Sequence, residues 1–210
     1  INKTSLIKKI ILKNKIDTII HLAAKTIVTE SEKKPKLYYN VNVLGTRSLL
    51  MAAENSSVKN FLFSSTAAVY GSKIRYVNEN SKTSPDSVYG KTKLQAEHLV
   101  KKEFKKNYII LRYFNVVGAS PSKKIGLINR YGQLFKNFAV EILKKKPKLS
   151  VYGNNYNTAD GTCIRDFIHV SDLADIHLKV LSKVSKNNKS IVLNCGYGKG
   201  FSVLEVVNSF

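Results

Sequence analysis

The stretch Asp17-Thr18-Ile19-Ile20-His21-Leu22-Ala23-Ala24 decides the fold class of this chain. Its continuous, β-branched apolar run predicts a buried strand, because a strand covered on both faces of a parallel sheet shows no polar–apolar alternation. Three further segments are predicted as strands: residues 59–64, 108–114 and 190–194. The sequence therefore predicts a sheet of several buried strands.

Helical spacing of apolar residues fills the gaps between these strands. It predicts helices over residues 4–15 (capped by Thr4 or Ser5), 35–55, 89–106, 133–146 and 171–183, and a last helix near the chain end. A short strand is also predicted at 149–152. Strands that alternate with helices of this length imply βαβ units. We therefore expect an α/β fold with a doubly wound, Rossmann-like parallel sheet.

The carboxyl ends of the predicted strands carry small and polar residues. Ligands of a doubly wound sheet bind at these ends. The ends hold Ala23-Ala24, Ser64-Ser65-Thr66 and Phe114-Asn115. We expect them to form the functional rim.

Tyr89 and Lys93 are the candidates for chemistry at that rim. They are four residues apart and would share one face of a helix. An ammonium beside the phenol would lower the pKa of Tyr89 from about 10 toward neutrality and allow it to act as a general base. The Thr66 hydroxyl could orient a substrate hydroxyl for the same proton transfer. The alternative is an ordinary amphipathic helix start.

Composition excludes several other classes of protein. The 210 residues, 43% of them hydrophobic, suffice for a sizeable core, and no stretch reaches the roughly 18 apolar residues of a membrane span. Cys163 and Cys195 match no metal-ligand spacing and are too few for a disulfide scaffold. We expect a cytoplasmic protein with neither a metal site nor a membrane partner.

The net charge of +21 raises the possibility of nucleic-acid binding. Only 5 of the 35 basic residues are Arg, which supplies most specific base contacts. The lysines are dispersed, without an aromatic-interleaved patch. We interpret them as a solvated coat and expect no nucleic-acid partner.

Longer motifs carry a family resemblance. They are His21–Ala24, Asn42–Thr46, Phe63–Gly71, Tyr89–Lys93, Leu111–Ala119 and Asp160–Ala174. On these residues the chain resembles the extended short-chain dehydrogenases/reductases, and closely the UDP-glucose 4-epimerases. The resemblance covers essentially the whole chain.

The resemblance implies NAD-dependent epimerisation at C4 of a UDP-hexose through a 4-keto intermediate. Tyr89 would be the base, Lys93 would hold it as phenolate and bond the nicotinamide ribose, and Thr66 would hold the 4-oxygen. The implied cofactor-binding residues are Leu22, Ala23, Ala24, Lys25, Thr26, Ser64, Tyr89, Lys93 and Phe114. The implied substrate-binding residues are Thr66, Tyr89, Asn115, Tyr152 and Arg165, with the Arg165 guanidinium on a phosphate. The implied partners are a UDP-sugar and a second copy, in a homodimer built on the helices around 36–55 and 88–106.

The chain departs from the family pattern in several places. The glycine-rich phosphate loop and the acidic residue that reads the ribose are absent, so we expect a chain that lacks the first βα unit and is truncated at both ends. Residues 1–118 would be the remainder of the NAD-binding domain and residues 119–210 a partial nucleotide-sugar-binding portion. We expect weak or no NAD binding by this chain alone. Val41 replaces an Asn frequent in the family, and Gln133 is only a candidate sugar ligand.

Other functions stay open at this point. They are another nucleotide-sugar epimerase, a decarboxylase of the same family, or a non-catalytic fragment of the fold. A 4,6-dehydratase is disfavoured, because Ala67-Ala68 stands where that reaction needs an acidic pair. His21 is interpreted as a structural histidine, His169 as a residue that orders its loop, and Asp172 as serving the first turn of its helix.

Overall fold

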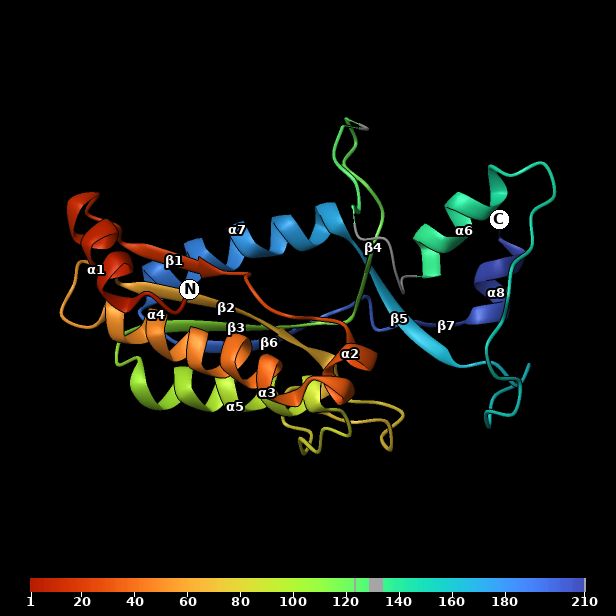
Figure 1. The fold of residues 1–210 in the computed structure, drawn as a ribbon, viewed down its shortest axis with the longest axis horizontal. Helices are drawn as coiled ribbons and strands as arrows, with labels where there is room; N and C mark the ends of the chain where they lie inside the picture. Colours follow the sequence, from red (N-terminus) through yellow and green to blue (C-terminus); the bar gives the residue numbers. More distant parts are fainter. Residues whose placement is uncertain (123, 129–133, 210) are drawn as a thin grey trace. The chain divides into compact units, whose positions relative to one another are not determined.

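The computed structural model describes residues 1–122, 124–128 and 134–209 (Figure 1). It divides into two compact units. The first comprises Ile1–Tyr113 and His177–Asn194, and the second comprises Phe114–Ile176 and Cys195–Phe210. The assignment of one part to the cofactor and the other to the nucleotide sugar stays a prediction.

The first unit is built on a four-stranded sheet. Its strands are β1 Thr18–His21, β2 Asn60–Thr66, β3 Asn107–Tyr113 and β6 Ile191–Cys195, in the order β1-β2-β3-β6. β1, β2 and β3 run parallel, with Ile20 opposite Leu62 and Leu62 opposite Ile109. The predicted α/β fold with a parallel sheet is confirmed, and all four predicted strands are present with shifted ends.

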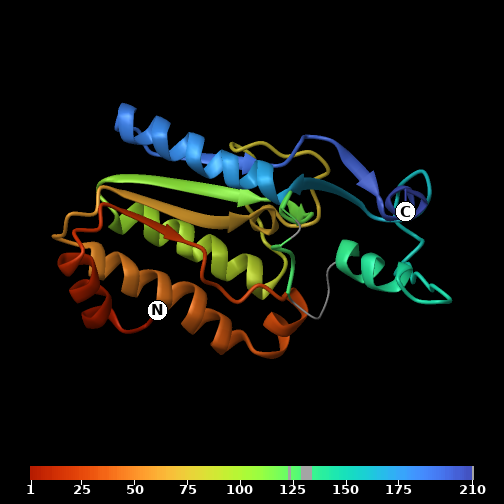
Figure 2. The same cartoon turned by 90° about the horizontal axis from the view of Figure 1, so that it is seen from above.

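Helices cover both faces of this sheet. α4 Gly45–Ala53 and α5 Val88–Glu103 lie on one face, and the part of α7 (Val170–Asn187) within the first unit lies on the other (Figure 2). α1 Thr4–Lys13 packs against α4. The predicted capping of α1 by Thr4 or Ser5 is wrong. The N-cap is Lys3, without a side-chain bond, because the Thr4 hydroxyl instead bonds the Ser48 hydroxyl at 2.7 Å.

The predicted helix over 35–55 consists of three consecutive segments. α3 Pro35–Tyr38 leads into a π-helix, η1 Tyr39–Leu44, which continues into α4. π-Helical turns are frequent at functional sites. The sequence analysis did not predict α2 Val28–Lys33 or the 3₁₀ turn η2 Ala67–Val69.

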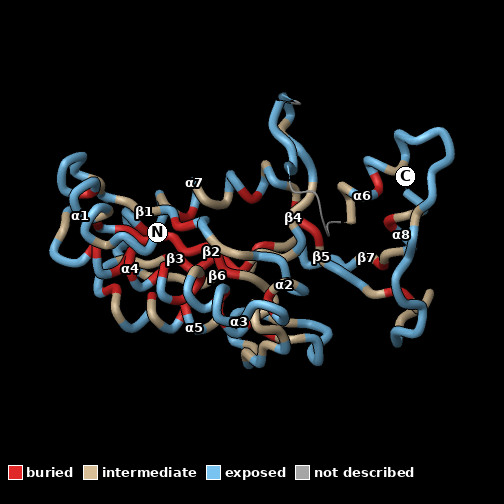
Figure 3. The backbone as a smooth tube through the Cα atoms, viewed as in Figure 1, coloured by how far each residue is buried: buried red, intermediate tan, exposed pale blue. Residues whose placement is uncertain are grey.

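The core of the first unit lies between the sheet and α1, α4 and α5, where Figure 3 shows most of the buried backbone. The buried side chains are Ile11, Leu49, Leu50, Ala52, Ala53, Val58, Phe61, Phe63, Ala96, Val100, Phe104 and Ile110. The prediction that the 17–24 strand is buried on both faces is wrong. β1 is an edge strand, so Ile20 is 47% exposed whereas its neighbour Leu62 is fully buried.

The second unit has a three-stranded sheet of β4 Asn115–Val117, β5 Ile164–His169 and β7 Gly200–Ser202. β4 and β5 are parallel, and β5 and β7 are antiparallel. Its helices are α6 Leu134–Ile142 and α8 Val203–Asn208. Residues 149–152 are irregular rather than a strand, and Leu149 packs on the core formed by Phe138, Phe167 and Val206.

A buried ion pair joins the helix layer to the sheet of the first unit. Glu97 on α5 accepts two hydrogen bonds from Arg112 on β3, from Nε at 3.0 Å and from Nη2 at 2.7 Å. The Ser65 hydroxyl on β2 donates to the same carboxylate at 2.5 Å. Arg112 Nη1 donates to the Tyr70 hydroxyl, which donates to Asn194 on β6. One carboxylate therefore links α5 to two neighbouring strands.

Replacing Glu97 with Ala should lower the free energy of unfolding by about 3–5 kcal/mol, because Arg112 would keep a buried charge without its partner. Urea denaturation measures this change. The matched control is Glu103→Ala on the same helix, which removes only an exposed pair with Arg47 and should cost less than about 1 kcal/mol. Equal losses in the two variants would contradict the structural role of the buried pair.

Candidate active site

The first turn of α5 places Tyr89 against the end of β2. The helix begins after Ser87, whose hydroxyl accepts the Gly90 N–H at 3.0 Å. A Cβ on Gly90 would lie only 2.7 Å from the Ala68 carbonyl oxygen. Glycine at this position therefore lets the helix start pack directly on the turn that follows Thr66.

Thr66 and Tyr89 are brought together by this packing. The Thr66 hydroxyl lies close enough to the Tyr89 phenol to lower its pKa, and it also accepts the Ala68 N–H at 3.2 Å. The phenol and the hydroxyl therefore meet at the carboxyl end of β2, as the proton-transfer hypothesis requires. The catalytic roles themselves stay predictions.

The predicted lowering of the Tyr89 pKa is wrong for this structure. Burial raises the pKa of Tyr89, and the nearby Thr66 hydroxyl opposes that rise only in part. Lys93 makes no contribution to the shift. Its amine lies instead over the Phe63 ring, 4.2 Å from the ring centroid. Spacing alone placed the cation and the phenol on one face without fixing where the amine points.

Lys93 is itself almost fully buried, with 3% exposed. Burial lowers its pKa to about 7, against the opposing attraction of Glu97 one turn further along α5. Among the residues that the structure describes, none accepts a hydrogen bond from the Lys93 amine. A ligand hydroxyl would supply the missing acceptor.

The predicted cofactor-lining segment, residues 22–26, follows β1 directly. Leu22 is 59% exposed, and Ala23 and Thr26 are also exposed. Asn42 of the π-helix holds this segment in shape: its side chain accepts the Lys25 N–H at 2.8 Å and donates to the Lys25 carbonyl at 3.0 Å. The same amide donates to the Thr92 hydroxyl on α5 at 3.1 Å.

Ser64, the remaining cofactor candidate of the first unit, is buried one residue before the Ser65 that bonds Glu97. His21 closes β1 as the structural histidine that we predicted. It packs between Phe61 and Phe63, and its Nε2 lies 2.9 Å from the Thr46 hydroxyl. Burial lowers its pKa to about 3, so the ring is neutral at physiological pH.

The second unit holds the other predicted ligands. Phe114 is half-buried and donates its N–H to the Cys195 carbonyl. Asn115 opens β4 and donates its side-chain amide to the Asp166 carbonyl at 2.9 Å, which brings it beside the β5 residue that follows Arg165. Tyr152 is 87% exposed. In the described part of the chain, no hydrogen bond joins Tyr152 to Asn115 or Arg165.

Arg165 is exposed on β5, where its Nη1 donates to the Ile164 carbonyl. Among the described residues Arg165 forms no ion pair with its neighbour Asp166, whose carboxylate accepts the N–H groups of Tyr197 and Gly198. Gln133 lies outside the described residues.

Two other predictions for the second unit have different outcomes. His169 orders its loop as expected: Nδ1 accepts the Ser171 N–H at 3.2 Å. Asp172 accepts a hydrogen bond from the Tyr197 hydroxyl. It therefore braces the loop before β7, a contact that its place at the start of α7 did not reveal.

The sequence analysis missed several residues that shape the site: Ser31, Glu32, Asn42, Glu97 and Arg112. Ser31 and Glu32 contact the first turn of α5, Asn42 holds residues 22–26, and Glu97 with Arg112 holds the helix to the sheet. Glu97 could have been noticed from the sequence, because an acidic residue is unusual on the apolar face of a helix. Glu97 lies on that face of α5, one turn after Lys93. No local pattern marks Ser31 or Glu32.

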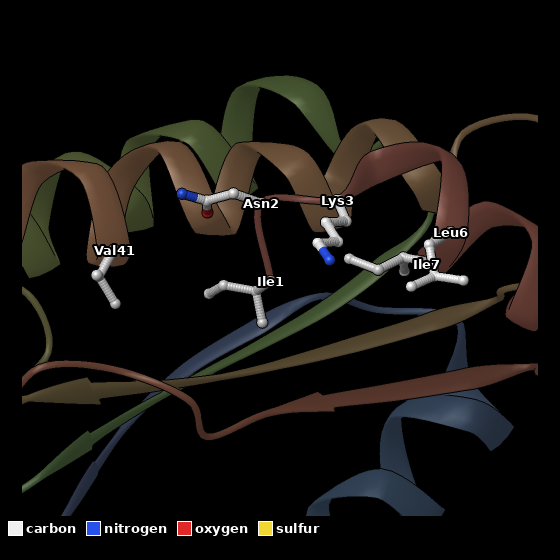
Figure 4. Close-up of a pocket in the computed structure, with 6 residues that line it drawn as sticks. All are labelled: Ile1, Asn2, Lys3, Leu6, Ile7 and Val41. Atoms are coloured by element: carbon white, nitrogen blue, oxygen red, sulfur yellow. The ribbon is translucent and has the colours of Figure 1, made fainter.

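A cavity of about 450 Å³ lies elsewhere in the first unit (Figure 4). Its lining is mainly apolar and comprises Ile1, Asn2, Lys3, Leu6, Ile7 and Val41. The cavity contains none of the predicted catalytic residues.

Two searches of the described ranges found no further kind of site. No group of three or more His, Cys, Asp or Glu side chains there is arranged to hold a metal ion. None of the helices in those ranges combines the length and the apolar character needed to cross a bilayer.

A family model, described as "NAD dependent epimerase/dehydratase family", matches residues 1–196. The chain belongs to this family. UDP-glucose 4-epimerases of Azospirillum brasilense and Dictyostelium discoideum are 38% and 42% identical to it. The alignments cover 100% and 92% of this chain but 62% and 59% of those enzymes. The chain thus spans less than two thirds of the length of these relatives.

Solved structures of epimerases share the fold closely. The UDP-glucose 4-epimerase of Stenotrophomonas maltophila, with bound NAD and formylated UDP-arabinopyranose, matches with a TM-score of 0.93 and 35% identity over 99% of this chain and 64% of that one. The enzyme of Brucella ovis in complex with NAD matches with a TM-score of 0.91 and 34% identity over 99% and 66%. The predicted family and Rossmann-like architecture are confirmed.

Replacing Lys93 with Met should stabilise the protein at about pH 6, and the gain should shrink as the pH rises toward about 10. Below its folded pKa of about 7, Lys93 is a buried ammonium. Between that value and its ordinary pKa of 10.5 the unfolded chain binds more protons, so wild-type stability rises with pH. Urea unfolding of both proteins across this range measures the difference.

The control for this experiment is Lys91→Met, an exposed position on the same helix. Its stability difference from the wild type should not change with pH. A Lys93→Met difference that is equally flat would show that the buried amine does not titrate in this range.

Proposed function

We propose that this protein is an NAD-dependent epimerase acting at C4 of a UDP-hexose, interconverting UDP-glucose and UDP-galactose through a 4-keto intermediate. The observation that carries the proposal is the pairing of Tyr89 with Thr66 at the end of β2, with Lys93 buried one helical turn away. Family membership and the relatives named above support it.

Tyr89 takes the proton from the sugar 4-hydroxyl in this proposal. A bound NAD would supply the hydride acceptor for C4 and the hydride donor to the opposite face of the ring, and Tyr89 would return the proton to the 4-oxygen. Because burial raises the pKa of the phenol, base function requires a positive charge at the hydroxyl. Lys93 is the cation on the same helix face, and burial, opposed by the attraction of Glu97, lowers its pKa to about 7.

Thr66 has the complementary role of holding the 4-oxygen. Its hydroxyl lies close enough to the Tyr89 phenol to lower its pKa, so an oxygen placed between the two side chains would contact both. That geometry keeps the transferred proton within hydrogen-bond reach. Ala67 and Ala68, which follow, offer no group for an elimination.

The residues present fit an NAD molecule at the rim of the first unit. The Lys93 amine, which donates a hydrogen bond to none of the described residues, would suit a ribose hydroxyl, and the segment 22–26 is held in place by Asn42. Leu22, Ala23, Ala24, Lys25, Thr26, Ser64, Tyr89 and Lys93 would hold the cofactor in the first unit, and Phe114 is a further proposed cofactor residue, in the second unit.

Asn115, Tyr152 and Arg165 would hold the UDP moiety. The exposed Arg165 guanidinium keeps most of its donors available for a phosphate. Tyr152 offers an exposed ring for the uracil or ribose.

A homodimer and a cytoplasmic location belong to the same proposal. Leu37, Leu44 and Met51 are exposed and recur every seven residues along the helical segment 35–53, which gives it an apolar stripe. That stripe is suited to pair with a second copy. The sparse cysteine content is typical of a reducing compartment.

Another nucleotide sugar is the second candidate substrate. The Campylobacter jejuni enzyme described as a UDP-Glc/GlcNAc 4-epimerase is 39% identical with a TM-score of 0.82. A decarboxylase of the family, or a non-catalytic version of the fold, is the further alternative.

The direct test supplies the full-length natural protein, loaded with NAD, with UDP-galactose and follows the appearance of UDP-glucose by NMR of the anomeric protons. We expect interconversion in both directions. Parallel samples with UDP-N-acetylglucosamine and UDP-glucuronate decide the sugar. No conversion of any of these by a folded, NAD-loaded sample would reject the epimerase assignment.

Tyr89→Phe in that protein should lower kcat by about 10²–10⁴-fold, the usual contribution of a general base, and should spare most NAD binding, because the other proposed cofactor residues are unchanged. Steady-state kinetics and the NAD content of the purified protein measure the two effects. Tyr39→Phe, at a 44% exposed position, is the control and should turn over normally. Unchanged turnover in Tyr89→Phe would refute the base role.

A further inference from the structure

α2 is a short helix that carries none of the predicted site residues, yet it contacts the first turn of α5. That turn contains Tyr89 and is called the catalytic turn below. It spans Val28–Lys33 and begins two residues after the cofactor-lining segment 22–26. It packs against α5 at the end where that helix begins (Figure 1). Its position between these two functional segments suggests that it couples them.

Two side chains of α2 accept hydrogen bonds from the backbone of the catalytic turn. The Ser31 hydroxyl accepts the Tyr89 N–H at 3.1 Å, and Glu32 Oε1 accepts the Val88 N–H at 2.8 Å. Ser31 is fully buried and donates its own proton to the Val28 carbonyl at 2.6 Å. The orientation of its hydroxyl is therefore fixed, with a lone pair directed at Tyr89.

These bonds go beyond ordinary capping of α5. The first N–H groups of a helix lack intrahelical partners, and Ser87 already serves as N-cap by accepting the Gly90 N–H. Solvent could satisfy the other two N–H groups. Instead α2 supplies both acceptors, and one of them holds Tyr89 itself.

α2 is in turn fastened to the rest of the first unit. The Tyr38 hydroxyl donates to the Ile27 carbonyl at 2.6 Å and accepts the Ile27 N–H at 3.0 Å, just before the helix begins. Tyr38 is fully buried. A displacement of the cofactor-lining segment would therefore reach Tyr89 through a hydrogen-bonded path rather than through a loose loop.

We propose that Ser31 and Glu32 are positioning residues for Tyr89, which hold its backbone in register with the cofactor-lining segment. This inference rests on the proposed function of Tyr89 as the base. Neither residue touches the reacting atoms. They act by keeping the phenol of Tyr89 beside the Thr66 hydroxyl.

Ser31→Ala in the full-length protein should lower kcat about tenfold while KM changes less than about twofold, because a small misplacement of a reacting group reduces the rate steeply. Glu32→Ala should show the same pattern, and Glu32→Gln, which keeps an acceptor oxygen, should restore most of the rate. The control is Thr29→Ala, an exposed position on the same helix, with kcat unchanged. Glu32 is exposed, so its variants test the inference even if Ser31→Ala fails to fold.

A second readout needs no turnover. The nearby Thr66 hydroxyl lowers the pKa of Tyr89, so its removal through misplacement should raise the midpoint of the Tyr89 titration, followed by the ¹³Cζ signal of labelled tyrosine. We expect a rise in Ser31→Ala and Glu32→Ala and none in Thr29→Ala.

The two readouts separate failure of this inference from failure of the proposed function. If the wild type converts no sugar nucleotide, the proposed function fails and the titration alone decides the positioning role. An unmoved Tyr89 midpoint in both Ser31→Ala and Glu32→Ala overturns the inference. A loss of kcat that Glu32→Gln does not restore overturns the role of Glu32.

Discussion

The buried fork between Arg112 and Glu97 is the constraint on which the first unit depends. Both side chains are almost inaccessible to solvent, and Ser65 donates to the same carboxylate. The helix that carries Tyr89 therefore accepts, through the Glu97 carboxylate, a hydrogen bond from the strand that leads to Thr66. Because hydrogen bonds are directional, this contact fixes both the rotation and the height of α5 above the sheet, which apolar packing alone would leave less defined.

The same carboxylate explains the electrostatic state of Lys93. A buried ion pair gains little stability overall, because desolvation offsets the Coulomb attraction. Glu97 is already shared between Arg112 and Ser65, so its charge compensates Lys93 only in part. Burial then dominates, and the pKa of the amine falls to about 7. The lysine is thus held near the point where small changes in its surroundings change its charge.

The sequence analysis correctly predicted the helices and strands whose burial pattern is regular along their whole length. β2, β3 and α5 were found because continuous apolar runs and helical spacing reflect burial over five or more residues. α2, η1, β4 and β7 span three to six residues each, and their existence depends on tertiary partners such as the Tyr38 hydroxyl that holds Ile27. In the site, spacing brought Tyr89 and Lys93 to one helix. It could not show that the amine turns toward Phe63, because β2 is distant in sequence.

That orientation of Lys93 bears on how a phenol with a raised pKa can act as a base. A cation–π contact contributes about 0.5–2 kcal/mol, whereas one unit of pKa corresponds to about 1.4 kcal/mol. The free energy of the contact between the Lys93 amine and the Phe63 ring is therefore similar to the free energy that corresponds to a modest shift of the Tyr89 pKa. A hydroxyl that accepts a hydrogen bond from the amine competes with the ring on comparable terms. Turning the amine toward Tyr89 would place a positive charge beside the phenol and reverse the effect of burial, so ligand binding and activation of the base would be one event.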